Sequence, residues 1–447
     1  MNIAFALLIL GAVMTAALSG VDGAAIGRAA LDGARKAAEV AIGLCGAIVF
    51  FTGMLAIVER AGGLRWLAQA LRPVLRRLFP EVAGDDAALG AIVLNFSANF
   101  LGLGNAATPF GLQAMQRLRQ LSPHGDAASD AMCLFLAINT SGLAVLPTDL
   151  LALRATHGAR DPAAILPAIW LATGTSTAVA VAASWFLRRR WSPAPLAPEP
   201  ASSDAAPAPT PDAHLPGAAE PALVGRTSTA IDPAPPGSAG AADALADAEG
   251  NVGRWRAPAL LAALAAMMVA ALVVGDGFTG WLLPGLIAAI VAAGLWRKVP
   301  VYEAFLAGGR QGLQAVLGIL APLVGVLAAV AMLRASGAVE GLVSVVGPLV
   351  RPLGVEPEVL PVALLRPLSG SGAFGFCSEL LARHGPDSAI GLQAVTLAGS
   401  SDTTFYILAV YFGAVGVRRG RWALAAGLCA DASGAIAAIV ASHLFLL

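Results

Sequence analysis

Two polar, glycine-rich segments interrupt long apolar stretches of this chain, and they constrain its fold more than any other feature. Residues 95–105 read Asn-Phe-Ser-Ala-Asn-Phe-Leu-Gly-Leu-Gly-Asn, and residues 366–375 read Arg-Pro-Leu-Ser-Gly-Ser-Gly-Ala-Phe-Gly. Backbone groups at membrane depth must be hydrogen-bonded, so irregular backbone survives there only where protein or a water-filled cavity surrounds it. One such break in each half of a membrane chain predicts a binding site between two repeats.

The composition predicts an all-α, polytopic membrane protein. Hydrophobic residues make up 57% of the 447 positions and charged residues 13%, whereas soluble domains carry roughly 25% charged residues. Several windows approach or exceed the roughly 20 apolar residues that cross a bilayer as a helix. These windows are residues 2–20, 37–58, 162–187, 257–275, 279–297, 312–333 and 422–446, and less regular ones lie at 128–146 and 388–411.

A sharp change in composition at residues 191–250 divides the chain. This segment is rich in Pro, Ala, Ser, Asp and Glu. Because it cannot bury enough apolar surface to fold, we predict a disordered linker between two membrane repeats, residues 1–190 and 251–447. Each repeat carries an apolar helix, an amphipathic stretch with a proline, an interrupted segment and a second polar cluster. The amphipathic stretches, 64–79 and 338–353, are predicted to lie at the headgroup boundary in contact with membrane lipid.

Basic residues predict the orientation of the repeats, since Arg and Lys in short loops mark the cytoplasmic side. Arg188, Arg189 and Arg190 precede the linker, and Arg254 and Arg256 follow it. We therefore predict a cytoplasmic linker in a bacterial inner membrane. If each interrupted segment is a re-entrant hairpin, the apolar helices of the two halves run in opposite directions. The repeats would then be inverted, as in many secondary transporters.

Polar side chains gather in and after each interruption. Amide and hydroxyl groups both donate and accept hydrogen bonds, which suits an uncharged or zwitterionic polar solute. We predict that these groups converge on one cavity, and the alternative that they cap half-helices and hold each hairpin to the bundle stays open. The candidate solute-binding residues are Asn95, Ser97, Asn99, Asn105, Asn139, Thr140 and Ser141 in the first half, and Ser369, Ser371, Ser400, Ser401, Thr403 and Thr404 in the second.

Two acidic residues in apolar segments of the second half, Asp402 and Asp431, are candidates for ion or proton coupling. An ionisable group at membrane depth is costly and is a functional candidate by default. Asp402 could bind a coupling cation or a proton, contact a cationic part of the solute, or pair with a buried arginine such as Arg366. The five histidines and four cysteines show no metal-ligand spacing, so we predict neither a metal site nor a cofactor.

The same motifs resemble known membrane families. Residues 95–112 and 138–141 resemble the signature of spore maturation protein A, and residues 366–372 and 403–413 resemble spore maturation protein B. The chain is thus similar to a fusion of both. The resemblance implies a nucleoside recognition or gate domain, a module related to concentrative nucleoside transporters and to ferrous iron transporters. It therefore implies a gated transport fold with hairpins, and Asp402 stands where the family is expected to carry glutamate.

We therefore predict a secondary transporter or gated permease for a small polar metabolite, either nucleoside-like, an amino acid or a small carboxylate. The alternatives are a non-transporting membrane scaffold or solute sensor and, with less support, an intramembrane hydrolase using Ser371 or Ser401 with His443. No phosphate-binding loop ending in Lys-Ser or Lys-Thr occurs, since the only lysines are Lys36 and Lys298. A formal net charge of zero gives no reason to expect nucleic acid as a partner. The expected partners are the solute and lipid, and a homo-oligomer stays open.

Overall fold

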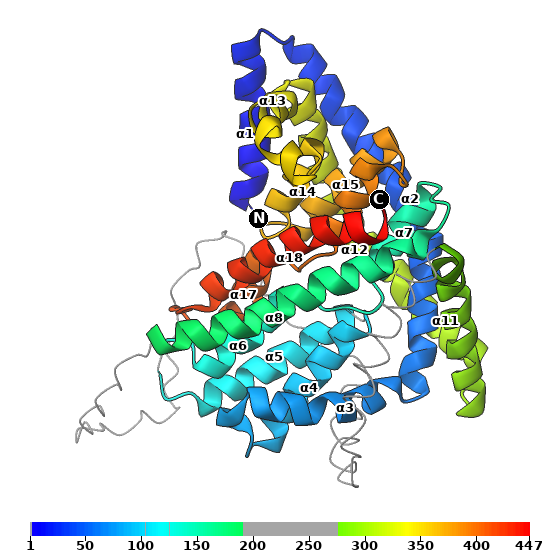
Figure 1. Ribbon diagram of the computed structural model, residues 1–447, viewed down its shortest axis with the longest axis vertical. Coiled ribbons are helices and arrows are strands. Elements are labelled where there is room, and N and C mark those ends of the chain that lie inside the picture. The colour runs from blue at the N-terminus through cyan, green and yellow to red at the C-terminus, as the bar shows by residue number, and fades with distance from the viewer. Residues whose placement is uncertain (1, 103, 125, 191–275) are drawn as a thin grey trace, which may run out of the picture. The chain divides into compact units, whose positions relative to one another are not determined.

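The computed structural model describes residues 2–102, 104–124, 126–190 and 276–447, and nearly all of them are helical (Figure 1). Within these ranges there is no β-strand, only an isolated bridge between Ala127 and Arg419. The predicted all-α class is therefore confirmed. The linker predicted at 191–250 and the apolar window at 257–275 lie outside the described residues.

The first half begins with two apolar helices and continues through a hairpin, a broken helix and a final long helix. Its elements are α1 (Asn2–Ser19), α2 (Gly23–Arg60), α3 (Gly63–Leu78), the 3₁₀ turn η1 (Pro80–Val82), α4 (Asp86–Phe100), α5 (Gly104–Leu121), α6 (Asp130–Thr140), α7 (Thr148–Thr156), η2 (Pro162–Ile165) and α8 (Leu166–Arg190). The predicted amphipathic stretch forms α3, which buries Leu64, Leu67 and Leu75 and exposes Arg76 and Arg77.

The second half repeats this order of elements. It comprises α11 (Asp276–Trp296), α12 (Val301–Ala335), α13 (Ala338–Val350), η3 (Arg351–Leu353), η4 (Pro357–Val359), α14 (Leu360–Leu365), α15 (Gly370–His384), α16 (Ala389–Ala398), α17 (Thr404–Ala414) and α18 (Ala423–Phe445). The turns η1 and η4 both read Pro-Glu-Val, and each comes just before the interrupted segment of its half. An inverted orientation of the two halves across a membrane stays a prediction.

Four segments of the described chain are long and apolar enough to cross a membrane. They are Gly23–Arg60, Pro162–Arg190, Val301–Ala335 and Ala423–Phe445, and a fifth candidate is the pair Ala338–Leu353 and Pro357–Leu365, which bends by 114°. A helix of roughly 20 residues suffices to span the hydrocarbon core. The predicted membrane character is thus confirmed, and α2 and α12 extend well beyond the windows 37–58 and 312–333.

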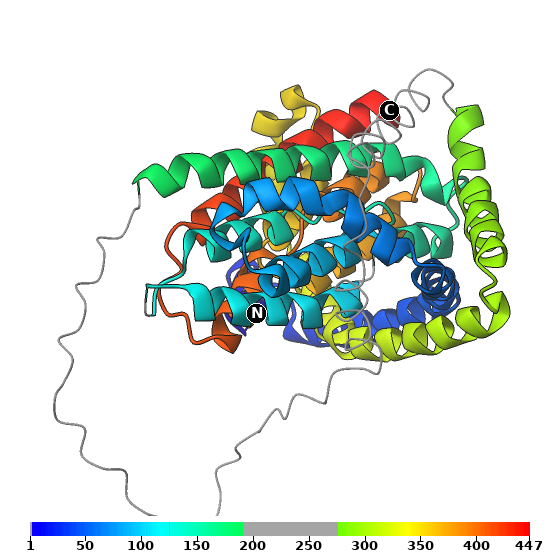
Figure 2. The same ribbon diagram turned by 90° about the horizontal axis from the view of Figure 1, so that it is seen from below.

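Corresponding helices of the two halves pack against each other. Helix α2 packs on α12, and α8 lies side by side with α18 (Figures 1 and 2). Helix α1 contacts α12 while its counterpart α11 contacts α2, so the two halves exchange their first helices. Small residues bring α2 and α12 close, because a Cβ added to Gly308 would meet the backbone at Thr52 and one added to Gly53 would lie 2.6 Å from the Phe305 ring.

Candidate functional site

The first interruption forms the tip of the hairpin between α4 and α5. Gly102 turns the chain with a φ of +80°, a conformation that glycine adopts readily. The tip packs on the segment after α6, where the Val145 amide donates to the Phe100 carbonyl at 2.7 Å. Helix α5 begins at Gly104 and contains Pro109 in its second turn. A proline so near the helix start removes one backbone bond and does not end the helix.

The second interruption joins α14 to α15 in the same manner. Ser369 caps α15, since its hydroxyl accepts a hydrogen bond from the Gly372 amide at 3.0 Å. The tip packs on the start of α17, where the Phe405 amide donates to the Pro367 carbonyl at 3.1 Å. Each hairpin tip therefore contacts the broken helix of its own half.

The two broken helices, α6 with α7 and α16 with α17, cross where each is unwound. The Asp402 amide donates to the Thr140 carbonyl at 2.7 Å, which ties one unwound segment to the other. Gly142 lies at the crossing with a φ of +65°. A Cβ added there would lie 2.7 Å from the Ser401 carbonyl carbon and 2.8 Å from the Asp402 nitrogen. The crossing therefore requires glycine at this position.

A cavity of about 470 Å³ opens beside this crossing, and both halves line it. Asn99 and Asn139 contribute from the first half, where the Asn99 amide nitrogen donates to the Asn139 side-chain oxygen at 2.9 Å. Ser371 and Ser401 contribute from the second half, together with Asp402. The structure thus brings these five predicted residues together around one cavity.

The remaining predicted residues whose side chains the structure describes do not line this cavity. Ser97 and Thr140 donate their hydroxyl protons to carbonyls of their own helices, and Ser400 donates to the last turn of α16, at 2.7–2.8 Å. Asn95 donates to the Ala107 carbonyl at 2.9 Å and so joins the two arms of the first hairpin. The side chain of Asn105 lies outside the described residues. A role in solute binding for any of these residues stays a prediction.

Side chains of α8 and α18 make hydrogen bonds with residues at the unwound segments of the two broken helices. The Ser141 hydroxyl lies 2.7 Å from the Thr177 hydroxyl of α8. In the second half, the Thr404 hydroxyl donates to the buried carboxylate of Asp431 on α18 at 2.6 Å. Thr403 lies between Thr404 and Asp402, and its amide donates to the Asp402 carboxylate at 2.7 Å. Asp431 therefore contacts the broken helix without lining the cavity.

Sequence reasoning missed much of the polar lining, which comprises Thr52, Glu59, Thr148, Asp149, Gln311 and Arg366. Thr52 and Glu59 lie on α2, and Gln311 lies on α12. A polar residue inside or beside an apolar window was the available signal, but the direction in which it points depends on how α2 and α12 pack. Arg366 was considered in the sequence only as a possible ion-pair partner of Asp402.

Arg366 and Asp402 form the charged part of the cavity in the second half. The Arg366 guanidinium donates to the Ser401 carbonyl through Nε, at 2.7 Å, and through Nη2. Its Nη2 also lies 3.8 Å from the Asp402 carboxylate, whose side chain remains 51% exposed. The alternative that Asp402 pairs with Arg366 therefore holds in this structure, and the pair leaves Asp402 accessible from the cavity.

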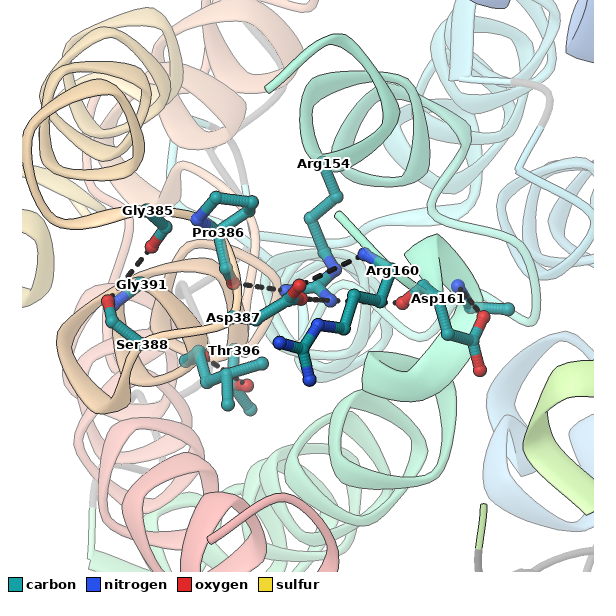
Figure 3. A network of polar contacts seen from close by, with 11 residues as sticks. Arg154, Arg160, Asp161, Gly385, Pro386, Asp387, Ser388, Gly391 and Thr396 are labelled. Carbon is teal, nitrogen blue, oxygen red and sulfur yellow. Dashed lines mark hydrogen bonds and ion pairs between the residues drawn. The ribbon is translucent and has the colours of Figure 1, made fainter. Parts of the chain in front are cut away.

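Two reciprocal ion-pair clusters, which we call latches, join the halves. In the Arg154 latch, Arg154 of α7 donates to the Pro386 carbonyl at 2.6 Å and to the Asp387 carboxylate at 2.9 Å (Figure 3). It also donates to the Asp161 carbonyl at 2.9 Å. In the Arg421 latch, Arg421 lies 2.8 Å from the Asp130 carboxylate at the start of α6. Each half thus supplies an arginine to an aspartate of the other.

The Arg421 latch is extended by a neighbouring pair on the surface. Arg419 donates through Nε to the Asp126 carboxylate at 3.1 Å, and this hydrogen bond lowers the pKa of Asp126. The Ala128 amide also donates to the Arg419 carbonyl at 2.9 Å. Backbone and side-chain contacts therefore both connect the α5–α6 loop with the segment before α18.

Comparison with known proteins agrees with the motifs. A family described as nucleoside recognition (Gate) matches residues 41–156 and 316–418. Spore maturation protein B of Bacillus subtilis (strain 168) is 43% identical over 159 residues, which are 36% of this chain and 89% of that protein. Spore maturation protein A of the same strain is 38% identical over 148 residues, which are 33% of this chain and 76% of that protein. The chain belongs to the spore maturation protein A and B family.

The predicted family resemblance is thereby confirmed, and no solved structure matches the chain. The nucleoside-recognition regions contain every lining residue of the cavity apart from Ile169, Gln311 and Ala315. The spore maturation family and its gate module support a membrane role related to transport. They name no solute for this chain.

Proposed function

We propose that this member of the spore maturation protein family is a secondary transporter or gated permease for a small polar metabolite. The observation that carries the proposal is the crossing of two unwound segments, one from each half, beside a cavity lined by both. Unwound backbone at membrane depth is tolerated where it lines a cavity, and discontinuous helices at a repeat interface are typical of transporter binding sites. The two hairpin tips and the two unwound segments, each held by hydrogen bonds, support a site built for a solute.

The size and chemistry of the cavity suit a small metabolite. Its volume of about 470 Å³ lies within the range of roughly 300–1,000 Å³ that is usual for ligand pockets. Asn99 and Asn139 supply amides, while Ser371 and Ser401 supply hydroxyls. These groups can both donate to and accept from a polar solute.

A hydrolytic role has less support. His443, which would have to act as the base for Ser371 or Ser401, contacts the Gly354 carbonyl at 2.7 Å and lies 3.4 Å from the Gln393 amide nitrogen. Neither of these partners lines the cavity. We therefore propose that the chain is not an enzyme. We also propose that it acts in a bacterial cytoplasmic membrane. The alternative function is that of a non-transporting scaffold or solute sensor.

Asp402 and Asp431 remain our candidates for coupling to an ion or proton gradient. Asp402 lines the cavity beside Arg366 and lies between α16 and α17. Asp431 of α18 is only 6% exposed, and its carboxylate accepts a hydrogen bond from Thr404 at the start of α17. A charge change at either carboxylate would therefore act directly on the unwound segment of the second half. This position suits a group that links ion binding to solute binding.

A thermal-shift screen of the full-length protein in detergent against nucleosides, nucleobases, amino acids and dicarboxylates tests the proposed binding. We expect one class to stabilise the protein, by about 2.7 kcal/mol at a concentration of one hundred times Kd. Ser371→Leu should abolish the stabilisation because it fills the cavity, whereas Ser344→Leu on the exposed face of α13 should retain it. No stabilisation by any compound would favour the scaffold reading.

A further inference from the structure

The charged groups of the cavity are unbalanced. Glu59, Asp149 and Asp402 are its acidic lining residues, and Arg366 is the basic one among the described lining residues. Arg366 lies beside Asp402 and donates to the Ser401 carbonyl, so its charge is already matched. The carboxylates of Asp149 and Glu59 make no ion pair within 4 Å in the described part of the chain.

Helix dipoles do not supply the missing positive charge. The carboxy-terminal ends of α4, α6, α14 and α16 reach the cavity, and so do the amino-terminal ends of α7, α15 and α17. Each end carries about half an elementary charge, negative for the first group and positive for the second. The negative ends are at least as many as the positive ones, so the helix dipoles supply no net positive charge to balance the acidic side chains.

A bound metal ion does not fit the excess of acid. No group of three or more His, Cys, Asp or Glu side chains in the described ranges is placed to hold a metal ion. The carboxylates instead lie on different elements, with Glu59 on α2, Asp149 on α7 and Asp402 before α17. Such a spread around a cavity of about 470 Å³ suits an organic cation several bonds long.

We propose that the solute of this cavity carries a protonated amine, and that Asp149 is the carboxylate that receives it. The inference rests on the proposed function and names the substrate class of the same site. Asp149 lines the cavity with an exposed side chain in the first turn of α7. An ammonium group there would make charge-assisted hydrogen bonds with a carboxylate that has no ion-pair partner within 4 Å and that Arg366 influences only from a greater distance. Asn99, Ser371 and Gln311 remain for the polar remainder of the solute.

Four solutes with the same four-carbon chain separate charge from shape. They are 1,4-diaminobutane, 4-aminobutyrate, 1,4-butanediol and succinate, and their binding to the full-length protein in detergent can be measured by calorimetry. We expect the diamine to bind at least tenfold more tightly than the diol, 4-aminobutyrate to bind between them, and succinate to bind most weakly. Equal binding of the diol or succinate, or no binding of either amine, would overturn the proposal. A binding signal from sodium chloride alone that equals the signal from the diamine would also overturn the proposal. It would mean that the carboxylates bind an inorganic cation.

Asp149→Asn tests the named residue with little change in shape. It should remove most of the preference for the diamine over the diol without lowering the unfolding temperature of the ligand-free protein. Glu39→Gln, which changes an exposed carboxylate on α2, is the matched control and should keep the preference. An unchanged preference in Asp149→Asn, or an equal loss in Glu39→Gln, would exclude Asp149 as the receiving group.

The binding measurement does not depend on transport. Amine binding without uptake into proteoliposomes would reject the proposed transporter and leave the amine site standing. Uptake of an uncharged or anionic solute through the same cavity, with no amine bound, would reject the amine site and leave the transporter standing.

Discussion

Replacing Gly142 with alanine is expected to lower the free energy of unfolding by roughly 3 kcal/mol and to abolish solute uptake. The φ of +65° at this residue is unfavourable for a side chain. The new Cβ would also lie 2.7 Å from the Ser401 carbonyl carbon. Because the obstructing atoms are backbone, they cannot swing aside as the end of a long side chain could. The two unwound segments would have to separate, and the cavity is built around their contact.

Gly158→Ala is the matched control for this prediction. Gly158 also has a positive φ, of +77°, but an added Cβ would meet no heavy atom within 4 Å. We expect a loss of about 1 kcal/mol from the backbone conformation alone and uptake close to that of the unaltered protein. Thermal unfolding in detergent and uptake into proteoliposomes measure both effects. Equal losses in the two variants would show that the crossing is not the sensitive feature.

Replacing Arg154 with methionine is expected to lower the free energy of unfolding by about 3 kcal/mol. Arg154 is only 1% exposed, and its removal leaves the Pro386 and Asp161 carbonyls without this donor. Within the described residues, the Asp387 carboxylate would keep only the hydrogen bond from the Arg160 amide, at 3.0 Å. The loss lies at the lower end of the usual range for buried ion pairs because the Asp387 side chain is 36% exposed. Methionine retains most of the apolar stem of arginine, so the change in the free energy of unfolding measures mainly the loss of the polar contacts.

Arg72→Met provides the comparison for Arg154→Met. Arg72 pairs with Asp86 at 2.8 Å, but the Asp86 side chain is 73% exposed. A pair of this kind contributes about 0–1 kcal/mol, so we expect a small change in the thermal unfolding midpoint. If Arg154→Met destabilised the protein no more than Arg72→Met, the Arg154 latch would not hold the halves together.

The interruptions and their hairpins could be predicted because their sequence breaks a strong pattern. Glycine, asparagine and serine inside an apolar window of membrane length leave few arrangements other than a broken or re-entrant segment. The hairpin at Gly102 and the breaks after Thr140 and Ala398 follow this expectation. The amphipathic helix at 64–79 could also be predicted, since the leucines of this stretch recur at helical spacing.

The lining of the cavity could be predicted only in part, because polarity does not show direction. Ser97 and Asn95 belong to the same cluster as Asn99, yet their side chains bond to helix carbonyls, whereas Asn99 faces the cavity. The choice depends on which side of α4 meets the second half. Thr52 and Gln311 line the cavity only because α2 packs on α12, and no local pattern shows that contact. The latches escaped prediction for the same reason, since Arg154 and Asp387 are far apart in the chain.

Solute uptake into proteoliposomes under an imposed sodium or proton gradient tests most directly the claim that the cavity carries a solute across the membrane. The assay uses the compound that stabilises the protein and compares the unaltered chain with Asp402→Asn. We predict gradient-dependent accumulation by the unaltered chain, and solute exchange that no longer responds to the gradient in Asp402→Asn. The same gradient dependence in both proteins would exclude coupling through Asp402, and no uptake by the unaltered chain would contradict the transporter itself.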